Sequence, residues 1–170
     1  PQAFIDKIKS FGLGTPLALE IEGEGTPRIK NITAEDWSGV SLPWMSIGYE
    51  TKLTPLQILA FYNAIANNGT MVRPHFVKEI QSHGRTLKSF DTEIIRDSIA
   101  SPAALAKARQ LMEGVVERGS AKQLNSSPYR IAGKTGTAQI SMNKFGYDKT
   151  HPSYQASFVG YFPADKPKYS

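Results

Sequence analysis

The stretch AGKTGTA at residues 132–138 combines one lysine, two threonines and two glycines within seven positions. Two kinds of site explain such a stretch, and they need different backbone structures. A phosphate-binding loop leads directly into a helix, whereas the wall of an acyl-transfer cleft runs as an extended strand. The structure of this stretch therefore decides both the fold around it and the class of chemistry.

The phosphate-binding interpretation meets two obstacles in the sequence. Such a loop needs a glycine five residues before the Gly-Lys-Thr triplet, and that position holds Pro128, which has no amide hydrogen. It also needs a helix after the lysine, but Thr135, Gly136 and Thr137 are poor helix formers. A nucleotide-binding module is therefore the less favoured interpretation.

An extended strand makes better use of the same residues. Lys134 supplies a positive charge, and Thr135 and Thr137 supply hydroxyls that can bind a carboxylate. Gly136 lets the backbone of a substrate approach the strand closely. An exposed strand in which the glycine only marks a bulge is the alternative without a function. The triplet thus favours an acyl-transfer cleft without establishing one.

Two strands are predicted around this stretch and after it. Residues 129–140 have a strand-like composition, and residues 155–162 alternate side chains as a strand does. We expect the two to pair. One more helical turn is expected at residues 120–124, before a loop at residues 125–128.

Further upstream the sequence predicts a hairpin and a helix. Residues 76–80 and 86–90 have strand-like patterns, with a turn at Gly84-Arg85 between them. Ser101-Pro102 is a typical helix start, and apolar residues follow a helical stripe from there to Gly119. We interpret this stripe as ordinary core packing.

The strongest helix signal begins at Thr54. This residue is a typical N-cap, Pro55 suits the first helical position, and Gln57 completes a capping box. Asn68-Gly69 is a suitable end. The segment between these signals has few polar positions, which predicts a helix that is buried on most sides.

The first quarter of the chain has weaker patterns. Apolar side chains recur at helical spacing in residues 4–11, and Gly12 is a suitable stop. Residues 17–21 are predicted to form a strand, which would place Glu20, Glu22 and Glu24 on one side. No partner group for acid/base chemistry is identifiable, so we interpret these carboxylates as a solvated strand face and turn.

The predicted elements combine segregated helices with antiparallel strands, which is typical of an α+β fold. The 170 residues suit one compact domain and include no cysteine and no apolar run of membrane-spanning length. The three histidines lack the paired spacing of metal ligands, so we expect no metal and no cofactor. The net charge of +5 comes from scattered lysines and arginines, so we expect no nucleic-acid binding.

Several stretches, taken in order with residues 133–139, carry a family resemblance. They are IGYE (47–50), TPLQ (54–57), ANNGTMVRP (66–74), GY (146–147) and ASFVGYFP (156–163). Over most of residues 11–163 the sequence resembles the transpeptidase domain of penicillin-binding proteins of the class B, cell-division type. This resemblance implies a serine peptidoglycan D,D-transpeptidase, which cross-links stem peptides through an acyl-enzyme and is the target of β-lactams.

The resemblance also implies residue roles. Lys134 would hold positive charge beside the nucleophile and help to bind the terminal carboxylate of the substrate. Thr135 and Thr137 would bind this carboxylate through their hydroxyls, and the backbone N–H of Thr137 would be one of two oxyanion-hole donors. Gly136 would keep the strand surface clear, and Tyr147 would help to wall the cleft.

Two further motifs of the family are expected to lie elsewhere. They are Ser-x-x-Lys, the nucleophile and base, and Ser-x-Asn, the proton shuttle and substrate-binding amide. The only match to either is Ser141-Met142-Asn143-Lys144, in which one serine would have to serve both motifs. We interpret this match as coincidental. Residues 1–170 are then a partial transpeptidase domain, a C-terminal portion truncated at both ends and inactive alone.

The expected partners and location follow from the same resemblance. The ligands would be peptidoglycan stem peptides and β-lactam antibiotics, and the longer protein would have cell-division partners. It would be membrane-anchored and work at the outer face of the cytoplasmic membrane, or in the periplasm. Exposed sheet edges predict self-association. The alternatives are a related penicillin-recognising hydrolase, either a β-lactamase or a D,D-carboxypeptidase, and a non-catalytic or nucleotide-binding module.

Overall fold

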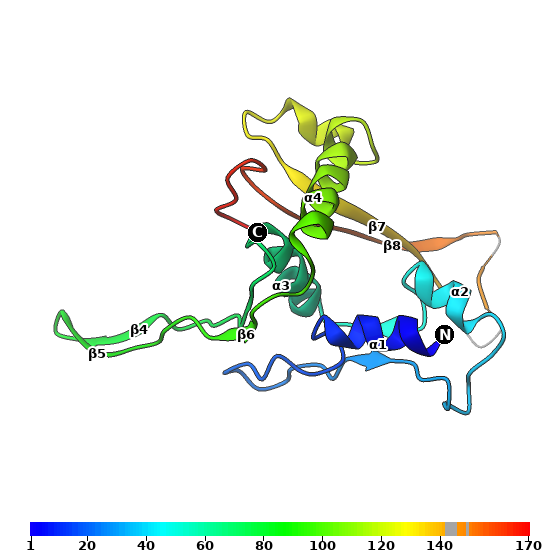
Figure 1. Ribbon diagram of the computed structural model, residues 1–170, viewed down its shortest axis with the longest axis horizontal. Helices are drawn as coiled ribbons and strands as arrows, with labels where there is room; N and C mark the ends of the chain where they lie inside the picture. The colour runs from blue at the N-terminus through cyan, green and yellow to red at the C-terminus, as the bar shows by residue number, and fades with distance from the viewer. Residues whose placement is uncertain (142–145, 149) are drawn as a thin grey trace. The chain divides into compact units, whose positions relative to one another are not determined.

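The computed structural model describes residues 1–141, 146–148 and 150–170, which form two compact units, Pro1–Pro102 and Ala103–Ser170 (Figure 1). The described strands pair into four antiparallel two-stranded sheets, β1–β2, β3–β6, β4–β5 and β7–β8. This mixture of helices and antiparallel strands confirms the predicted α+β class. In chain order the elements are α1 (Gln2–Ser10), β1 (Arg28–Ile29), α2 (Ser41–Ser46), β2 (Thr51–Lys52), α3 (Pro55–Ala66), β3 (Met71–Val72), β4 (Glu79–Ser82), β5 (Arg85–Ser89), β6 (Ile94–Arg96), α4 (Pro102–Glu117), the 3-10 helix η1 (Lys122–Ser126), β7 (Ala132–Ile140) and β8 (Ser153–Tyr161).

Helix α3 starts with the predicted capping box. The Thr54 hydroxyl accepts a hydrogen bond from the Gln57 amide at 3.1 Å, and the Gln57 side chain accepts one from the Thr54 amide at 2.9 Å. The Gln57 side chain is buried and also donates to the Thr15 carbonyl at 3.0 Å. One glutamine therefore closes the helix start and attaches it to the loop that follows α1.

The predicted strand at residues 17–21 is wrong. Ala18 has a left-handed φ of 55°, which interrupts an extended run. The Glu24 carboxylate accepts hydrogen bonds from the amides of Leu17 and Leu19, the second at 3.0 Å. Because a side chain takes the amides that a neighbouring strand would need, the segment forms a loop, and the three nearby glutamates do not share a strand face.

The predicted hairpin forms with shifted bounds. Its turn is His83-Gly84, at φ values of 47° and 74°, as the tight turn of a two-residue hairpin requires. The turn thus lies one residue before the predicted Gly84-Arg85, and β4 begins three residues later than predicted. The β4–β5 hairpin is a narrow ribbon that extends from β3 and β6 within the first unit (Figure 1).

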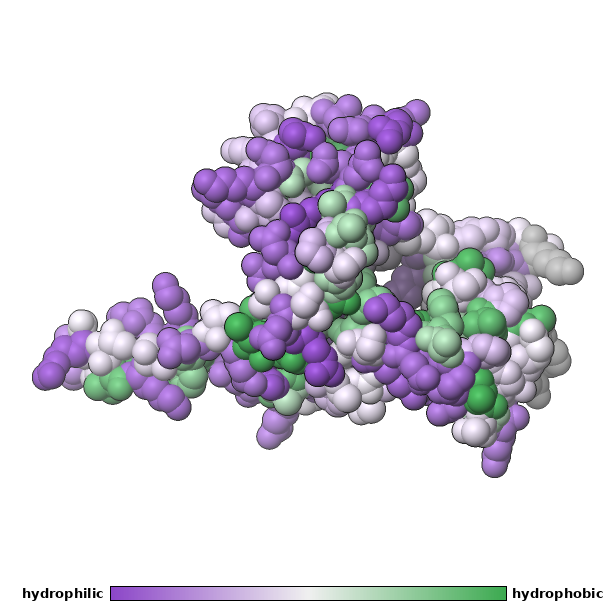
Figure 2. Space-filling view, in the orientation of Figure 1, coloured by the Kyte–Doolittle hydropathy of each residue, from purple (hydrophilic) through white to green (hydrophobic). Residues whose placement is uncertain are grey.

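The second unit has a core to which α4 and the β7–β8 hairpin both contribute. Leu105, Met112 and Val116 are the buried residues of α4. Ala132 of β7 and Tyr161 of β8, which pair with each other, are the most buried residues of the hairpin. The viewed face of this unit around α4 is mainly hydrophilic (Figure 2), as expected for an amphipathic helix.

The strands of the second unit differ from their predicted bounds by a few residues. Strand β7 begins at Ala132 and not at Tyr129, whereas β8 begins at Ser153, two residues earlier than predicted. The extra turn expected at residues 120–124 is the 3-10 helix η1. None of the helices in the described part of the chain is long and apolar enough to cross a membrane.

A buried lysine joins three segments of the first unit. The Lys30 ammonium lies 2.8 Å from a Glu50 carboxylate oxygen and 3.4 Å from one of Asp36, and it donates to the Asp36 carbonyl at 2.7 Å. Only 8% of the Lys30 side chain is exposed, so these partners compensate for the water that it loses. Hydrogen bonds from Lys30 and then Ser41 lower the pKa of Glu50, and the bond to Glu50 raises the pKa of Lys30.

We expect the substitution Thr54→Ala to lower the free energy of unfolding by about 1–2 kcal/mol, because it removes the N-cap bond of α3. Thr92→Ala is the matched control, since Thr92 is exposed and lies outside the helices and strands. Urea unfolding of the 170-residue chain measures both. Equal effects of the two substitutions would contradict the role of the cap.

Protonation of Glu50 should destabilise the first unit in acid. Because the folded state lowers the pKa of Glu50, its contribution is fully present above the unfolded pKa of about 4.3 and is lost as the pH falls through the folded pKa. Glu50→Gln should therefore flatten the loss of stability between pH 7 and pH 3, measured by denaturant unfolding. Glu35→Gln, at an exposed glutamate, is the control and should leave the slope unchanged.

Candidate active site

The Lys-Thr-Gly stretch is an extended strand. Strand β7 pairs with β8 over nine residues, from Ala132 opposite Tyr161 to Ile140 opposite Ser153. A phosphate-binding loop would need a helix after Lys134, where the structure has strand. The nucleotide-binding alternative is therefore wrong for this stretch.

The strand separates its functional side chains onto two faces. Side chains alternate along a strand, so Lys134 and Gly136 belong to one face and Thr135 and Thr137 to the other. The two threonines lie about 7 Å apart along the strand. The hydroxyls of Thr135 and Thr137 can thus bind one ligand group on their shared face, whereas the Lys134 side chain leaves the strand on the opposite face.

Two glycines of β7 leave no room for a side chain. A Cβ at Gly133 would lie 2.4 Å from the Phe158 ring and 2.6 Å from the Val159 carbonyl oxygen. A Cβ at Gly136 would lie 2.5 Å from the Ser157 hydroxyl. These glycines let the facing side chains of β8 lie close against β7, so the ribbon stays thin.

Residue Thr135 is held by two hydrogen bonds. Its hydroxyl lies 2.5 Å from the hydroxyl of Ser120, and its carbonyl accepts a hydrogen bond from the Lys134 ammonium at 2.5 Å. Lys134 is exposed and Thr135 is half-buried. The Lys134 side chain therefore curves from its own face of the strand back toward the backbone.

The contact with Ser120 is the part of this arrangement that sequence reasoning missed. Ser120 directly follows Gly119, where the sequence predicts the end of the preceding helix; in the structure α4 ends two residues earlier, at Glu117. The signal available in the sequence was a hydroxyl residue at this helix end. No local pattern, however, indicated that it would meet a residue fifteen positions later.

The structure brings the four residues 134–137 together on one strand and places Tyr147 apart from them. Tyr147 lies in the connection between β7 and β8, beyond the Ile140–Ser153 pair, and 38% of it is exposed. No hydrogen bond or ring contact in the described part of the chain joins Tyr147 to β7, so its role stays a prediction.

The Ser-x-x-Lys match at residues 141–144 belongs to the same connection. Met142, Asn143 and Lys144 are outside the described residues. The hydroxyl of Ser141 donates a hydrogen bond to the Gly146 carbonyl at 2.9 Å. A nucleophilic serine instead needs its hydroxyl directed to a general base.

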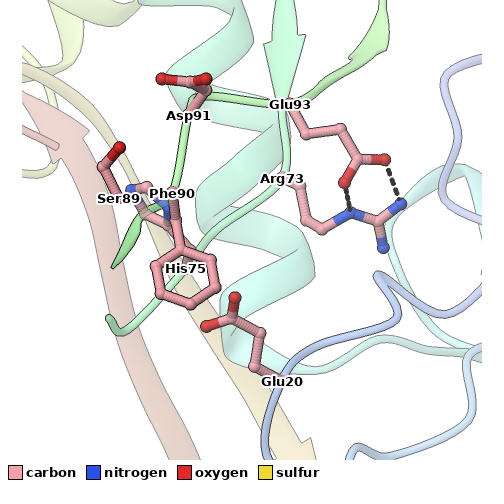
Figure 3. Close-up of a pocket in the computed structure, with 7 residues that line it drawn as sticks. All are labelled: Glu20, Arg73, His75, Ser89, Phe90, Asp91 and Glu93. Atoms are coloured by element: carbon pink, nitrogen blue, oxygen red, sulfur yellow. Dashed lines mark hydrogen bonds and ion pairs between the residues drawn. The ribbon is translucent and has the colours of Figure 1, made fainter. Parts of the chain in front are cut away.

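A separate cavity of about 250 Å³ lies in the first unit (Figure 3). Arg73 and Glu93 form a two-pronged ion pair there, with both N–O distances 2.7 Å. The Arg73 guanidinium also donates to the carbonyls of Leu17 and Ala18, and its hydrogen bonds lower the pKa of Glu93. Arg73 thus holds the loop that follows α1 through hydrogen bonds to its backbone. The lining residues are Glu20, Arg73, His75, Ser89, Phe90, Asp91 and Glu93.

This cavity contains none of the predicted site residues. Apart from the ion pair, its acidic groups and its histidine are exposed. Among the described residues no group of three or more histidine, aspartate or glutamate side chains is placed to hold a metal ion. The arrangement at β7 is therefore the candidate site that the sequence and the structure both support.

The strand geometry agrees with the comparison to known families. The sequence model of the penicillin binding protein transpeptidase domain matches residues 1–170. The chain belongs to this family, which confirms the resemblance that the motifs indicated.

Relatives of known name carry the same classification. Penicillin-binding protein PbpB of Mycolicibacterium smegmatis is 34% identical over 179 residues, which cover 99% of this chain and 26% of that protein. Peptidoglycan D,D-transpeptidase MrdA of Haemophilus influenzae is 31% identical over 184 residues, covering 95% and 27%. The chain thus spans about a quarter of the length of the curated relatives that it matches.

Solved structures agree with the fold. The chain matches penicillin-binding protein 3 of Mycobacterium tuberculosis, complexed with aztreonam, at a TM-score of 0.81 and 29% identity, covering 99% of this chain and 38% of that one. It matches penicillin-binding protein A of the same organism, a ceftriaxone acyl-enzyme complex, at a TM-score of 0.81 and 26% identity, covering 99% and 36%. These matches confirm the predicted fold.

Replacing Gly133 by alanine should lower the free energy of unfolding by about 1–3 kcal/mol, because the new methyl group meets the Phe158 ring and a backbone oxygen. Gly39→Ala is the matched control, since open space surrounds Gly39 and its φ is not left-handed. This control should be neutral or stabilising by up to about 1 kcal/mol. Denaturant unfolding of both variants tests the close packing; equal stabilities would exclude it.

Proposed function

We propose that this chain forms the Lys-Thr-Gly wall of the active site of a serine peptidoglycan D,D-transpeptidase. The observation that supports the proposal is that residues 134–137 lie on an extended strand that has β8 as its one partner among the described residues. In an antiparallel pair, alternate residues direct their amides and carbonyls away from the partner strand. The edge of β7 opposite β8 therefore offers a row of peptide groups to a substrate.

In the proposed complex the substrate lies along this edge as an added strand. The Thr137 amide is proposed to point to the edge and to donate to the oxyanion of the tetrahedral intermediate. The bond from Lys134 to the Thr135 carbonyl supports this orientation. Residues two apart in a strand direct their amide and carbonyl to the same side. A Thr135 carbonyl that faces the free edge of β7 therefore places the Thr137 amide at that edge too.

The side chains divide the remaining work. We propose that the hydroxyls of Thr135 and Thr137, which share a face, bind the terminal carboxylate of the stem peptide or of a β-lactam. The ammonium of Lys134 adds positive charge beside the nucleophile and the carboxylate. Gly136 keeps the strand clear for the substrate, and Tyr147 contributes to the wall of the cleft.

The nucleophile is proposed to come from outside these 170 residues. The family requires Ser-x-x-Lys and Ser-x-Asn, and the one stretch that matches them begins with Ser141, whose hydroxyl donates to a loop carbonyl. We propose that residues 1–170 are part of one transpeptidase domain, to which both compact units belong. The remainder of that domain would supply the serine, the base and the second oxyanion donor.

We place the longer protein in peptidoglycan synthesis during cell division, anchored to the membrane and acting at the outer face of the cytoplasmic membrane or in the periplasm. The division-type stretches IGYE, TPLQ and ANNGTMVRP support this placement. Cell-division proteins are the proposed partners. Exposed apolar residues such as Leu87 and Phe76 support self-association of the isolated chain.

Labelling with a fluorescent penicillin tests the proposal. The isolated 170-residue chain should stay unlabelled, because it lacks the proposed nucleophile. The longer protein should be acylated, and Lys134→Ala in that protein should lower the acylation rate constant on the order of 10²-fold, since it removes the positive charge beside the nucleophile and the carboxylate.

Lys166→Ala is the control, because Lys166 is exposed in the same unit and lies outside β7 and β8. It should leave the acylation rate unchanged. Covalent labelling of the isolated chain at Ser141 would refute the assignment of the nucleophile. An unchanged rate in Lys134→Ala would refute the assignment of β7 as the wall of the site.

A further inference from the structure

We propose that Ser120 is a positioning residue for Thr135, and that its hydroxyl directs the Thr135 hydroxyl toward the carboxylate of the acyl donor. The two oxygens lie 2.5 Å apart, and Ser120 precedes Thr135 by fifteen positions. This inference rests on the proposed function, because it specifies how one of the carboxylate-binding hydroxyls is held.

The end of α4 fixes the position of Ser120 from both sides. On one side, Gly119 has no space for a Cβ, which would lie 2.8 Å from backbone atoms of Val115. On the other side, Ala121 is 1% exposed, and its amide donates to the Val115 carbonyl at 3.0 Å. The backbone before and after Ser120 is therefore held against the last turns of α4, and the exposed serine between them has a defined place.

The two hydroxyls form a directional pair. Each hydroxyl has one proton to donate and can accept a second hydrogen bond. When Thr135 donates its proton to a carboxylate, its oxygen is free to accept the proton of Ser120. A chain in which Ser120 donates to Thr135 and Thr135 donates to the anion strengthens both bonds, because each polarises the next.

The pair also reduces the entropy that the substrate must remove on binding. A threonine hydroxyl on an exposed strand can rotate among several positions, and a partner at 2.5 Å restricts this rotation. The backbone of Thr135 is meanwhile held by the bond from Lys134 to its carbonyl. Both the hydroxyl and the peptide group of Thr135 are thus oriented before a substrate arrives.

The test compares two substrates with the longer protein, penicillin G and its methyl ester, which lacks the carboxylate charge. For Ser120→Ala we expect the second-order acylation rate constant to fall about tenfold with penicillin G. With the ester it should change little, because the lost contact acts on the carboxylate. Ser120→Thr keeps the hydroxyl and should restore most of the rate with penicillin G.

Ser126→Ala is the matched control, since the Ser126 hydroxyl donates to the Gln123 carbonyl within η1 and should leave both rates unchanged. Circular dichroism of each variant shows whether it is folded. Equal losses with the acid and the ester would overturn the positioning role, and so would an unchanged rate in Ser120→Ala or no rescue in Ser120→Thr. If the unmodified protein is acylated by neither compound, the proposed function fails and the inference fails with it.

Discussion

The antiparallel pairing of β7 with β8 is the constraint on which the candidate site depends. Nine residue pairs hold the Lys-Thr-Gly stretch extended, from Ala132 opposite Tyr161 to Ile140 opposite Ser153. The first of these pairs is buried, and the strands become exposed farther along. The β7–β8 pairing therefore starts in the core of the second unit, and residues 134–137 lie where the strands become more exposed to solvent.

This pairing also explains why small residues occur where they do. Phe158 of β8 lies against Gly133, and Ser157 lies against Gly136, at distances that no Cβ would tolerate. The register then puts the threonines on one face and the lysine on the other. The ammonium and the hydroxyls thus extend from opposite faces of the same strand.

Local patterns predicted the parts of the fold that depend on local interactions. The capping box at Thr54 needs only neighbouring residues, and the alternation in residues 155–162 reports the two faces of one strand. The strand predicted at residues 17–21 is wrong because its backbone groups bind Glu24 and Arg73. Such contacts come from the tertiary structure and leave no periodic trace in the sequence.

The site shows the same division between local and distant information. The residue types at 134–137 predicted a strand, and the structure places them on one, β7; their role in binding an anionic acyl donor stays a prediction. The contact from Ser120 was not predictable, because it depends on where α4 ends relative to β7. The sequence motif thus names the groups that would touch a substrate, while the surrounding fold determines how they are oriented.

A crystal structure of the longer protein acylated by penicillin G would show whether β7 binds the acyl donor. We expect the carboxylate of the antibiotic to lie within hydrogen-bonding distance of the Thr135 and Thr137 hydroxyls, and the acyl oxygen to accept a hydrogen bond from the Thr137 amide. A bound antibiotic whose carboxylate and acyl oxygen both lie away from β7 would contradict it.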